Sequence, residues 1–150
     1  MTEPGYQEFP PSDTPLEQHE NGTRIRVIAG QTAAGTIGAV RNEYVSPTYL
    51  DVELPAGEPF SQEVGAGDNA LLYVIEGNLK VGAAGTAVGA RTMGILGPGD
   101  TVQVTAGEKT RFLLISAQPL NEPVARGGPF VMNTKEEIIQ AFEDYRHNRF

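Results

Sequence analysis

The chain contains no cysteine, and histidine occurs only twice among its 150 residues. A disulfide, a thiolate metal ligand and a cysteine nucleophile are therefore excluded. His19 lies in a proline-rich stretch and His147 in a charged C-terminal tail. We expect both side chains to be solvated on the surface rather than to serve as metal ligands or as members of a serine triad.

Basic residues are also scarce. The 11 lysines and arginines stand against 19 acidic residues, which gives a formal net charge of −8. A chain of this charge repels phosphate backbones and anionic lipid surfaces, so we expect no direct nucleic-acid partner and no membrane partner. No apolar run approaches the ~18 residues that span a bilayer, and the first residues lack the basic and apolar regions of a secretory signal. These absences predict a cytoplasmic protein.

Prolines gather near the N-terminus, in residues 1–23. Such a segment disfavours a helix and has little to bury, so we expect an extended arm. From residue 24 onward the pattern changes to short apolar runs. Residues 49–54 alternate apolar and acidic side chains, which is typical of a strand with one buried face. Further strands are predicted at residues 24–29, 71–75, 79–81, 93–96, 101–105 and 111–116.

Two local patterns carry more specific predictions. The unbroken apolar run at 71–75 predicts a strand covered on both faces, and Gly77 in the following turn predicts a hairpin that returns to 79–81. Near the C-terminus, Thr134 and Glu137 have the spacing of a helix capping box. The apolar stripe of the helix that follows is expected to consist of Ile138, Ile139, Phe142 and Tyr145.

Catalytic signals are weak. No Gly-x-Ser-x-Gly elbow is present, and the glycine-containing run from residue 30 lacks the lysine of a phosphate-binding loop. Carboxylates remain as candidate acid–base groups, but a working pair needs surroundings that push the two pKa values apart. The candidates are Asp51, Glu53, Glu63, Asp68, Glu76 and Asp100. We expect Asp51 and Glu53 on a solvated strand face, and Glu76 and Asp100 at turns.

The middle of the chain resembles the cupin pattern, a small β-barrel fold that usually holds a metal by three histidines and a glutamate. Gly57 and Gly77 match the two ends of the first cupin motif, and Gly99 matches the start of the second. On this resemblance, the metal-ligand positions fall at Glu63, Gly65, Ala70 and Thr110. Glycine and alanine have no ligating side chain, and a transition metal needs three or four protein donors. The resemblance therefore implies no metal and no cofactor in this chain.

The C-terminal third resembles the pirin family, most specifically through residues 128–134 and also through 111–114, 119–124 and 136–138. Pirins are two-cupin proteins, and the resemblance is to their C-terminal cupin. It implies an all-β fold, a single cupin-type double-stranded β-helix (jelly-roll barrel) over residues 24–150, with the extended arm at 1–23 and a short C-terminal helix. The iron and the quercetin-dioxygenase activity of the family belong to the N-terminal cupin and match no residue here.

Three functions follow as hypotheses. The first is a metal-free structural or binding module that forms a homodimer or pairs with a separate cupin chain, because an uncovered sister-facing surface favours association. The alternative is a small-ligand-binding or dioxygenase-like cupin that uses the barrel interior, with Glu63, Thr110 and Arg111 at the pocket lip and a ligand that the sequence does not identify. The third, a transcriptional cofactor, rests on fold-level analogy and is disfavoured by the acidic charge.

Overall fold

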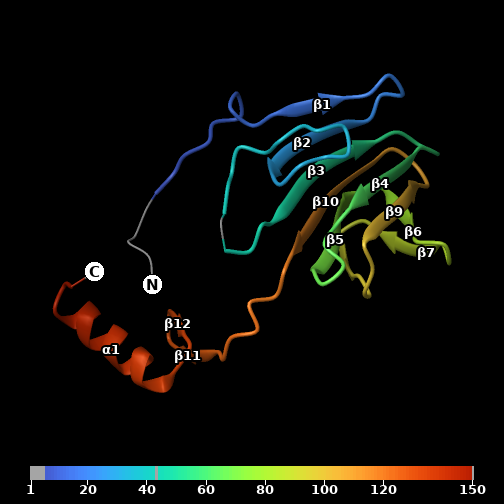
Figure 1. Cartoon of the computed structure of the whole chain (residues 1–150). Helices are drawn as coiled ribbons and strands as arrows, with labels where there is room; N and C mark the ends of the chain where they lie inside the picture. The colour runs from blue at the N-terminus through green and yellow to red at the C-terminus, as the bar shows by residue number, and fades with distance from the viewer. Residues whose placement is uncertain (1–5, 43, 150) are drawn as a thin grey trace. The chain divides into compact units, whose positions relative to one another are not determined.

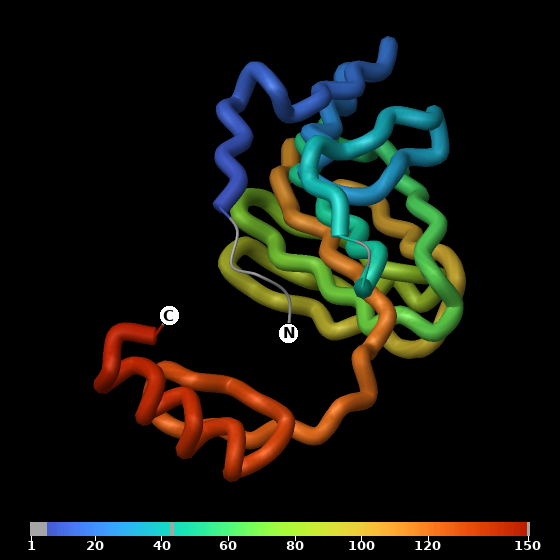
Figure 2. Tube along the Cα trace, turned by 60° about the vertical axis from the view of Figure 1, so that its left-hand side comes forward, coloured from blue at the N-terminus to red at the C-terminus, as the bar shows by residue number. Residues whose placement is uncertain are grey.

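The computed structural model describes residues 6–42 and 44–149, and it divides into two compact units. The first unit ends at Pro119 and the second begins at Leu120. Figure 1 and Figure 2 trace both units along the chain. The pirin resemblance implied one cupin domain over residues 24–150, and no signal in the sequence marked the division after Pro119.

The first unit is a sandwich of two antiparallel sheets. The larger sheet has the strand order β1-β2-β3-β10-β5-β8, and the smaller one has the order β4-β9-β6-β7. The strands of the larger sheet are β1 (Leu16–Gln18), β2 (Arg24–Ala29), β3 (Thr48–Leu54), β10 (Thr110–Ala117), β5 (Asn69–Glu76) and β8 (Thr92–Ile95). Those of the smaller sheet are β4 (Pro59–Glu63), β9 (Thr101–Ala106), β6 (Asn78–Val81) and β7 (Thr86–Gly89). From β3 to β6 each successive strand changes sheet, and this alternation is the connectivity of the predicted jelly-roll barrel.

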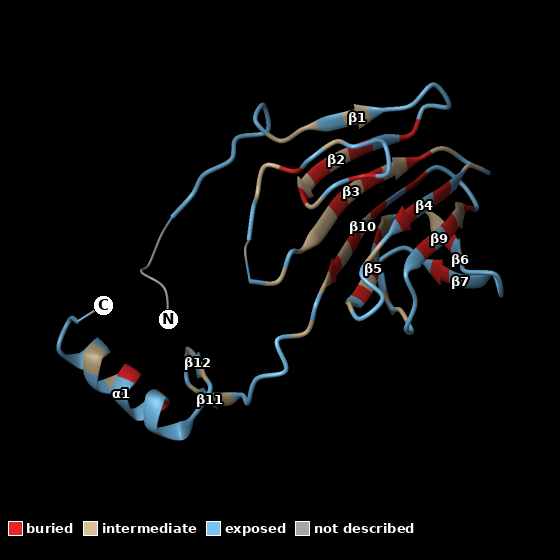
Figure 3. Cartoon of the chain, viewed as in Figure 1, coloured by how far each residue is buried: buried red, intermediate tan, exposed pale blue. Residues whose placement is uncertain are grey.

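The hydrophobic core lies between the two sheets, where the buried residues of Figure 3 gather. Every second side chain of a strand points inward, as the two-residue period of a strand requires. The fully buried core residues of the larger sheet are Val27, Leu50, Val52, Leu54, Leu72, Val74, Phe112 and Leu114. Phe60 of β4 meets Phe112 of β10 edge to face, with 5.6 Å between ring centroids. This pair joins the two sheets through the centre of the barrel.

The strands predicted from sequence are present as β2, β3, β5, β6, β8, β9 and β10, with ends shifted by a residue or two. Within the first unit, the pattern missed the short strands β1, β4 and β7. Strand β1 lies inside the predicted arm and pairs with β2, so that Leu16 stands opposite Arg26. Residues 6–15 of the arm carry no strand, and Tyr6 is 87% exposed.

The predicted hairpin at Gly77 is wrong. Strand β5 before this glycine belongs to the larger sheet, and β6 after it belongs to the smaller one. Gly77 has a φ of 80°, and a Cβ at this position would lie 2.6 Å from the Lys109 carbonyl oxygen and would also clash with the Thr110 hydroxyl. Glycine is needed here because the chain crosses tightly from one sheet to the other.

The prediction that both faces of β5 are covered is also wrong. Leu72 and Val74 point into the core and are fully buried, whereas Tyr73 between them is 38% exposed. The outward side chains of this strand are nevertheless apolar. The run at residues 71–75 is therefore continuous because its inward side chains build the core and its outward side chains are apolar as well.

The second unit combines one hairpin with one helix. Strand β11 (Ala125–Gly127) pairs with β12 (Phe130–Met132), and α1 (Lys135–Arg146) follows. The predicted capping box is confirmed, because the Glu137 N–H donates to Thr134 Oγ1 at 3.2 Å and the Thr134 N–H donates to the Glu137 carboxylate at 2.9 Å. These two bonds satisfy backbone donors that the first turn of a helix leaves free.

The helix has a narrower apolar stripe than predicted. Ile138 and Ala141 are buried, and the ring of Phe142 meets that of Phe130 with 5.1 Å between centroids. Ile139 is 60% exposed, so its place in the stripe is wrong. Successive helical residues are about 100° apart around the axis, and a stripe through Ile138 therefore leaves its neighbour outside.

Candidate functional site

Glu63, the first predicted ligand position, points away from the barrel interior. Along β4 the exposed and buried residues alternate, with Phe60 and Gln62 buried and Glu63 exposed. The Gln62 side-chain amide donates to the Gln31 carbonyl at 3.1 Å and to the Glu63 carbonyl at 2.8 Å. Gln62 is therefore the inward polar residue of this strand, and its position two residues after the apolar Phe60 is the sequence signal for it.

Thr110, predicted both as a ligand position and at a pocket lip, is buried and 1% exposed. Its hydroxyl oxygen accepts the Asn78 N–H at 3.1 Å and lies 3.0 Å from the Asn78 carbonyl and 2.8 Å from the Glu108 carbonyl. These contacts hold the end of β10 against the start of β6. The lip role is a wrong prediction, because a fully engaged buried hydroxyl presents nothing to a ligand.

The remaining ligand positions, Gly65 and Ala70, lie beside one carboxylate. The Gly65 N–H and the Ser116 hydroxyl each donate to Asp68 Oδ2 at 3.2 Å. Ser116 is fully buried and stands opposite Ala70 in the sheet. Asp68 thus links the turn at Gly65 to β10. Gly65 and Ala70 have no side chain that could add a second metal ligand beside it.

The donor set does not fit the iron that the fold family implies. Among the described residues, no group of three or more histidine, cysteine or acidic side chains is placed to hold a metal ion. The inward positions instead carry an amide at Gln62, a methyl group at Ala70 and a hydroxyl at Thr110 that is bonded to backbone. Iron or a similar ion needs several anionic or imidazole donors at one point.

Arg111, the third predicted lip residue, lies on the outer side of the larger sheet. Its guanidinium donates two hydrogen bonds to the Asp51 carboxylate, at 2.9 and 2.7 Å. Hydrogen bonding to Asp51 raises the pKa of Arg111 above its ordinary value. Arg111 and Thr110 are consecutive in a strand and point to opposite faces, so they do not share a lip. The predicted solvation of Asp51 is wrong, since its side chain is only 12% exposed.

An apolar surface covers much of the outer side of the larger sheet. We call it the outer apolar patch, and its residues are Tyr49, Leu71, Tyr73, Ile75, Met93, Ile95, Leu113 and Ile115. None of these side chains is buried, and Met93 and Ile95 on β8 are 53% and 79% exposed. The sequence predicted a surface for association but did not identify the residues that form it.

A polar cluster ties β1 to the loop that follows β2. Glu17 accepts a hydrogen bond from the Thr32 hydroxyl and lies 2.6 Å from His19 Nε2. Burial alone would raise the pKa of Glu17, but hydrogen bonds from Thr32, Thr36 and His19 outweigh it and lower the pKa below 4.5. His19 is 42% exposed, as the prediction of a surface histidine requires, yet it is paired with a carboxylate.

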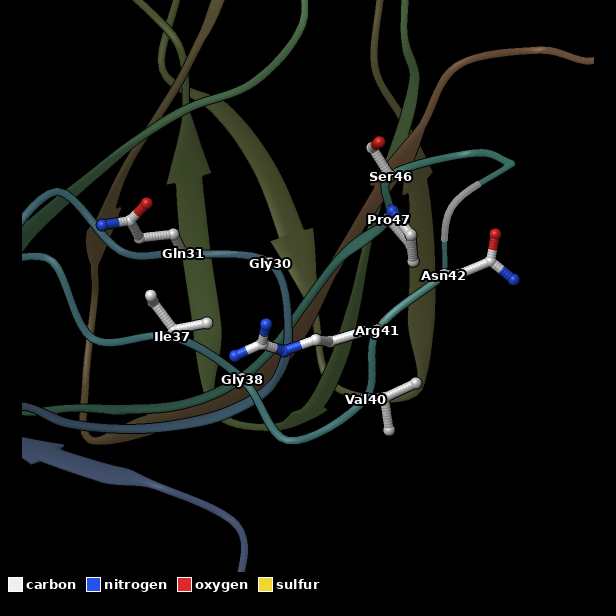
Figure 4. A pocket seen from close by; sticks show the side chains of 9 residues that line it. All are labelled: Gly30, Gln31, Ile37, Gly38, Val40, Arg41, Asn42, Ser46 and Pro47. Atoms are coloured by element: carbon white, nitrogen blue, oxygen red, sulfur yellow. The ribbon is translucent and has the colours of Figure 1, made fainter. Parts of the chain in front are cut away.

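A pocket of about 290 Å³ lies in the loop between β2 and β3 (Figure 4). Its lining residues are Gly30, Gln31, Ile37, Gly38, Val40, Arg41, Asn42, Ser46 and Pro47. The lining mixes apolar side chains with polar ones and the guanidinium of Arg41. None of the three predicted lip residues takes part in this pocket.

Comparison with known proteins decides the family. The model of the pirin C-terminal cupin domain matches residues 49–150. The chain belongs to the pirin family. It is 44% identical over 150 residues to a pirin-like protein of Caulobacter vibrioides, a match that covers 100% of this chain and 54% of that protein. It is 38% identical over 153 residues to the pirin of Homo sapiens, covering 98% of this chain and 51% of that protein.

A solved structure supports the same relationship. The crystal structure of quercetin 2,3-dioxygenase from Acinetobacter baumannii matches with a TM-score of 0.87 and 35% identity, covering 97% of this chain and 50% of that chain. The predicted pirin relationship and the predicted cupin fold are both confirmed. The pirin-type chain spans about half the length of the curated relatives it matches. In its described part, no helix has the length and apolar character that a membrane crossing requires.

Proposed function

We propose that this pirin-type cupin is a structural and binding module that holds no metal of its own. The observation that carries the proposal is the state of the four cupin ligand positions. Glu63 faces outward, and Gly65 and Ala70 offer no ligating side chain. The hydroxyl of Thr110 is held by backbone groups. The interior is devoted to packing, and the surface therefore carries the function.

The proposed mode of action is pairing with a second cupin, in a homodimer or with a separate cupin chain. Two observations support it. The relatives are about twice as long as this chain, so in them the matched half is joined to a second half of similar size. The outer apolar patch offers this chain a surface on which a second cupin can bind in place of that second half.

Metal analysis tests the metal-free part of the proposal. Purified protein is incubated with Fe²⁺ and separately with Ni²⁺ without oxygen, desalted, and measured by inductively coupled plasma mass spectrometry. We expect far less than one ion per chain, because the ligand positions lack donors. One tightly held ion per chain would contradict the proposal, and its loss in Asp68→Asn would place the ion beside the ligand positions, which this carboxylate adjoins. Glu20→Gln, on an exposed residue, is the matched control.

One observation favours a second candidate function, a small-ligand-binding or dioxygenase-like cupin. A structure that is 35% identical to this chain carries the name quercetin 2,3-dioxygenase. The core disfavours a reaction in the interior, because Phe60, Phe112 and their apolar neighbours pack together between the sheets. Oxygen consumption with quercetin, measured with and without added Fe²⁺, separates the two functions. Turnover would establish the enzymatic one.

A further inference from the structure

The outer apolar patch runs across neighbouring strands of the larger sheet in rows of paired residues. In one row, Leu113 of β10 stands opposite Tyr73 of β5, which stands opposite Met93 of β8. Side chains directly opposite in an antiparallel pair are neighbours, with Cβ atoms about 5 Å apart. Each row therefore forms an unbroken apolar strip.

The next row repeats this arrangement. Ile115 stands opposite Leu71, and Leu71 stands opposite Ile95. On its other side Ile115 is opposite Tyr49 of β3, so this row extends over four strands. Single exposed apolar residues are ordinary on a protein surface, but adjacent rows of them mark a surface that another body covers.

We infer that a second copy of this chain covers the outer apolar patch, so that two larger sheets pack face to face about a two-fold axis. This inference rests on the proposed function, because it names the surface and the partner of the binding module. A two-fold interface places the same patch on both chains and needs a patch that is complementary to itself. Facing sheets pack about 10 Å apart, at a distance that lets outward side chains interdigitate.

Charge is the reason for choosing a second copy. The outer side of the larger sheet bears three arginines and three carboxylates beside the patch, namely Arg24, Arg26, Arg111, Asp51, Glu53 and Glu76. Glu76 belongs to this set because the register of β5 shifts there, so that Glu76 stands opposite the outward Arg111. Three positive and three negative charges give a formal sum of zero, whereas the whole chain carries −8. Two identical faces of this kind approach without net repulsion.

Several of these charges are already neutralised within the chain. Arg111 is bonded to Asp51 through two hydrogen bonds, and Arg24 lies 3.5 Å from the Glu53 carboxylate. A partner of strong opposite charge would gain little from such a face. A second copy of the same sheet, with its apolar patch and its equal numbers of positive and negative side chains, fits this face because apolar contact then supplies the attraction.

Analytical ultracentrifugation over a concentration series tests the inference. We expect the wild type to form dimers. Ile95→Glu or Met93→Glu should raise the dissociation constant of the dimer by at least about tenfold. Both residues are exposed, so the variants should fold normally. Ile37→Glu is the matched control, since Ile37 is 52% exposed but lies in the loop pocket. Wild type that remains a single chain up to hundreds of micromolar would overturn the inference.

The absence of cysteine allows a second, independent measurement of the surface. Met93→Cys and Ile37→Cys each create a single thiol that can carry a spin label. We expect a label at position 93 to give a short inter-chain distance by pulsed electron resonance, and one at position 37 a longer distance. A dimer in which the inter-chain distance is shorter at position 37 than at position 93 would show that the patch is not the interface. The metal content of the same samples tests the proposed function separately, so each failure is recognisable.

Discussion

At the scale of single residues, the direction of one side chain decides the chemistry of the barrel. Glu63 and Gln62 are neighbours, and a strand sends them to opposite faces. A displacement of one position in the cupin motif therefore replaces an outward carboxylate by an inward amide. The motif spacing predicted the barrel correctly but assigned the inward position to the wrong residue.

Glu17 should make stability depend on pH on the acid side. Its pKa is lowered in the folded chain, so its stabilising effect is fully present above its ordinary value of 4.5 and is lost as pH falls through the folded pKa. We expect Glu17→Gln to lower the free energy of unfolding by about 1–2 kcal/mol at neutral pH and to approach the wild type in acid. Urea unfolding at several pH values measures this. Glu20→Gln, on an exposed neighbour, should show no such pattern.

Thr110 should behave as a structural residue. Thr110→Val keeps the shape of the side chain but leaves the Asn78 N–H without its acceptor inside the protein. We expect a loss of about 1–3 kcal/mol in the free energy of unfolding, measured by chemical denaturation. Thr110→Ser keeps the hydroxyl and should retain most of that stability. Equal losses in the two variants would show that the methyl group, rather than the hydrogen bonds, matters here.

At the scale of elements, local signals predicted existence better than pairing. The alternation at residues 49–54 and the capping box at Thr134 each identify one element by itself, and both elements are present. The glycine turn at Gly77 predicts a hairpin that the structure does not contain, because a tight glycine turn has the same local sequence whether the next strand returns to the same sheet or crosses to the other. Pairing depends on distant partners such as β10, which local patterns do not include.

The capping box predicts the response of the helix to mutation. Thr134→Ala removes the acceptor for the Glu137 N–H and should destabilise α1 by about 1 kcal/mol. Hydrogen exchange of the α1 amides, measured by mass spectrometry, should accelerate accordingly. Thr134→Ser keeps the acceptor and should protect the helix nearly as well as the wild type. An equal acceleration in both variants would count against a capping role.

At the scale of the whole molecule, the apolar patch links sequence, fold and assembly. The run at residues 71–75 is apolar throughout because its inner half builds the core and its outer half builds the patch. Association through this patch should stabilise the folded chain by mass action. We expect the melting temperature to rise with protein concentration in scanning calorimetry, and Ile95→Glu to remove that rise. A concentration-independent wild-type melting temperature would contradict association.

The sequence by itself determined the family, the all-β class, most of the strands and the capped helix. These depend on periodicity, on turn residues and on motifs of a few neighbouring positions, all of which are local. The tertiary structure decided which side of the barrel each ligand position faces, which sheet receives β6, and how the outward residues of β3, β10, β5 and β8 join into one patch. Those features depend on strand pairing between residues far apart in the chain, because only pairing brings separate apolar side chains into one surface.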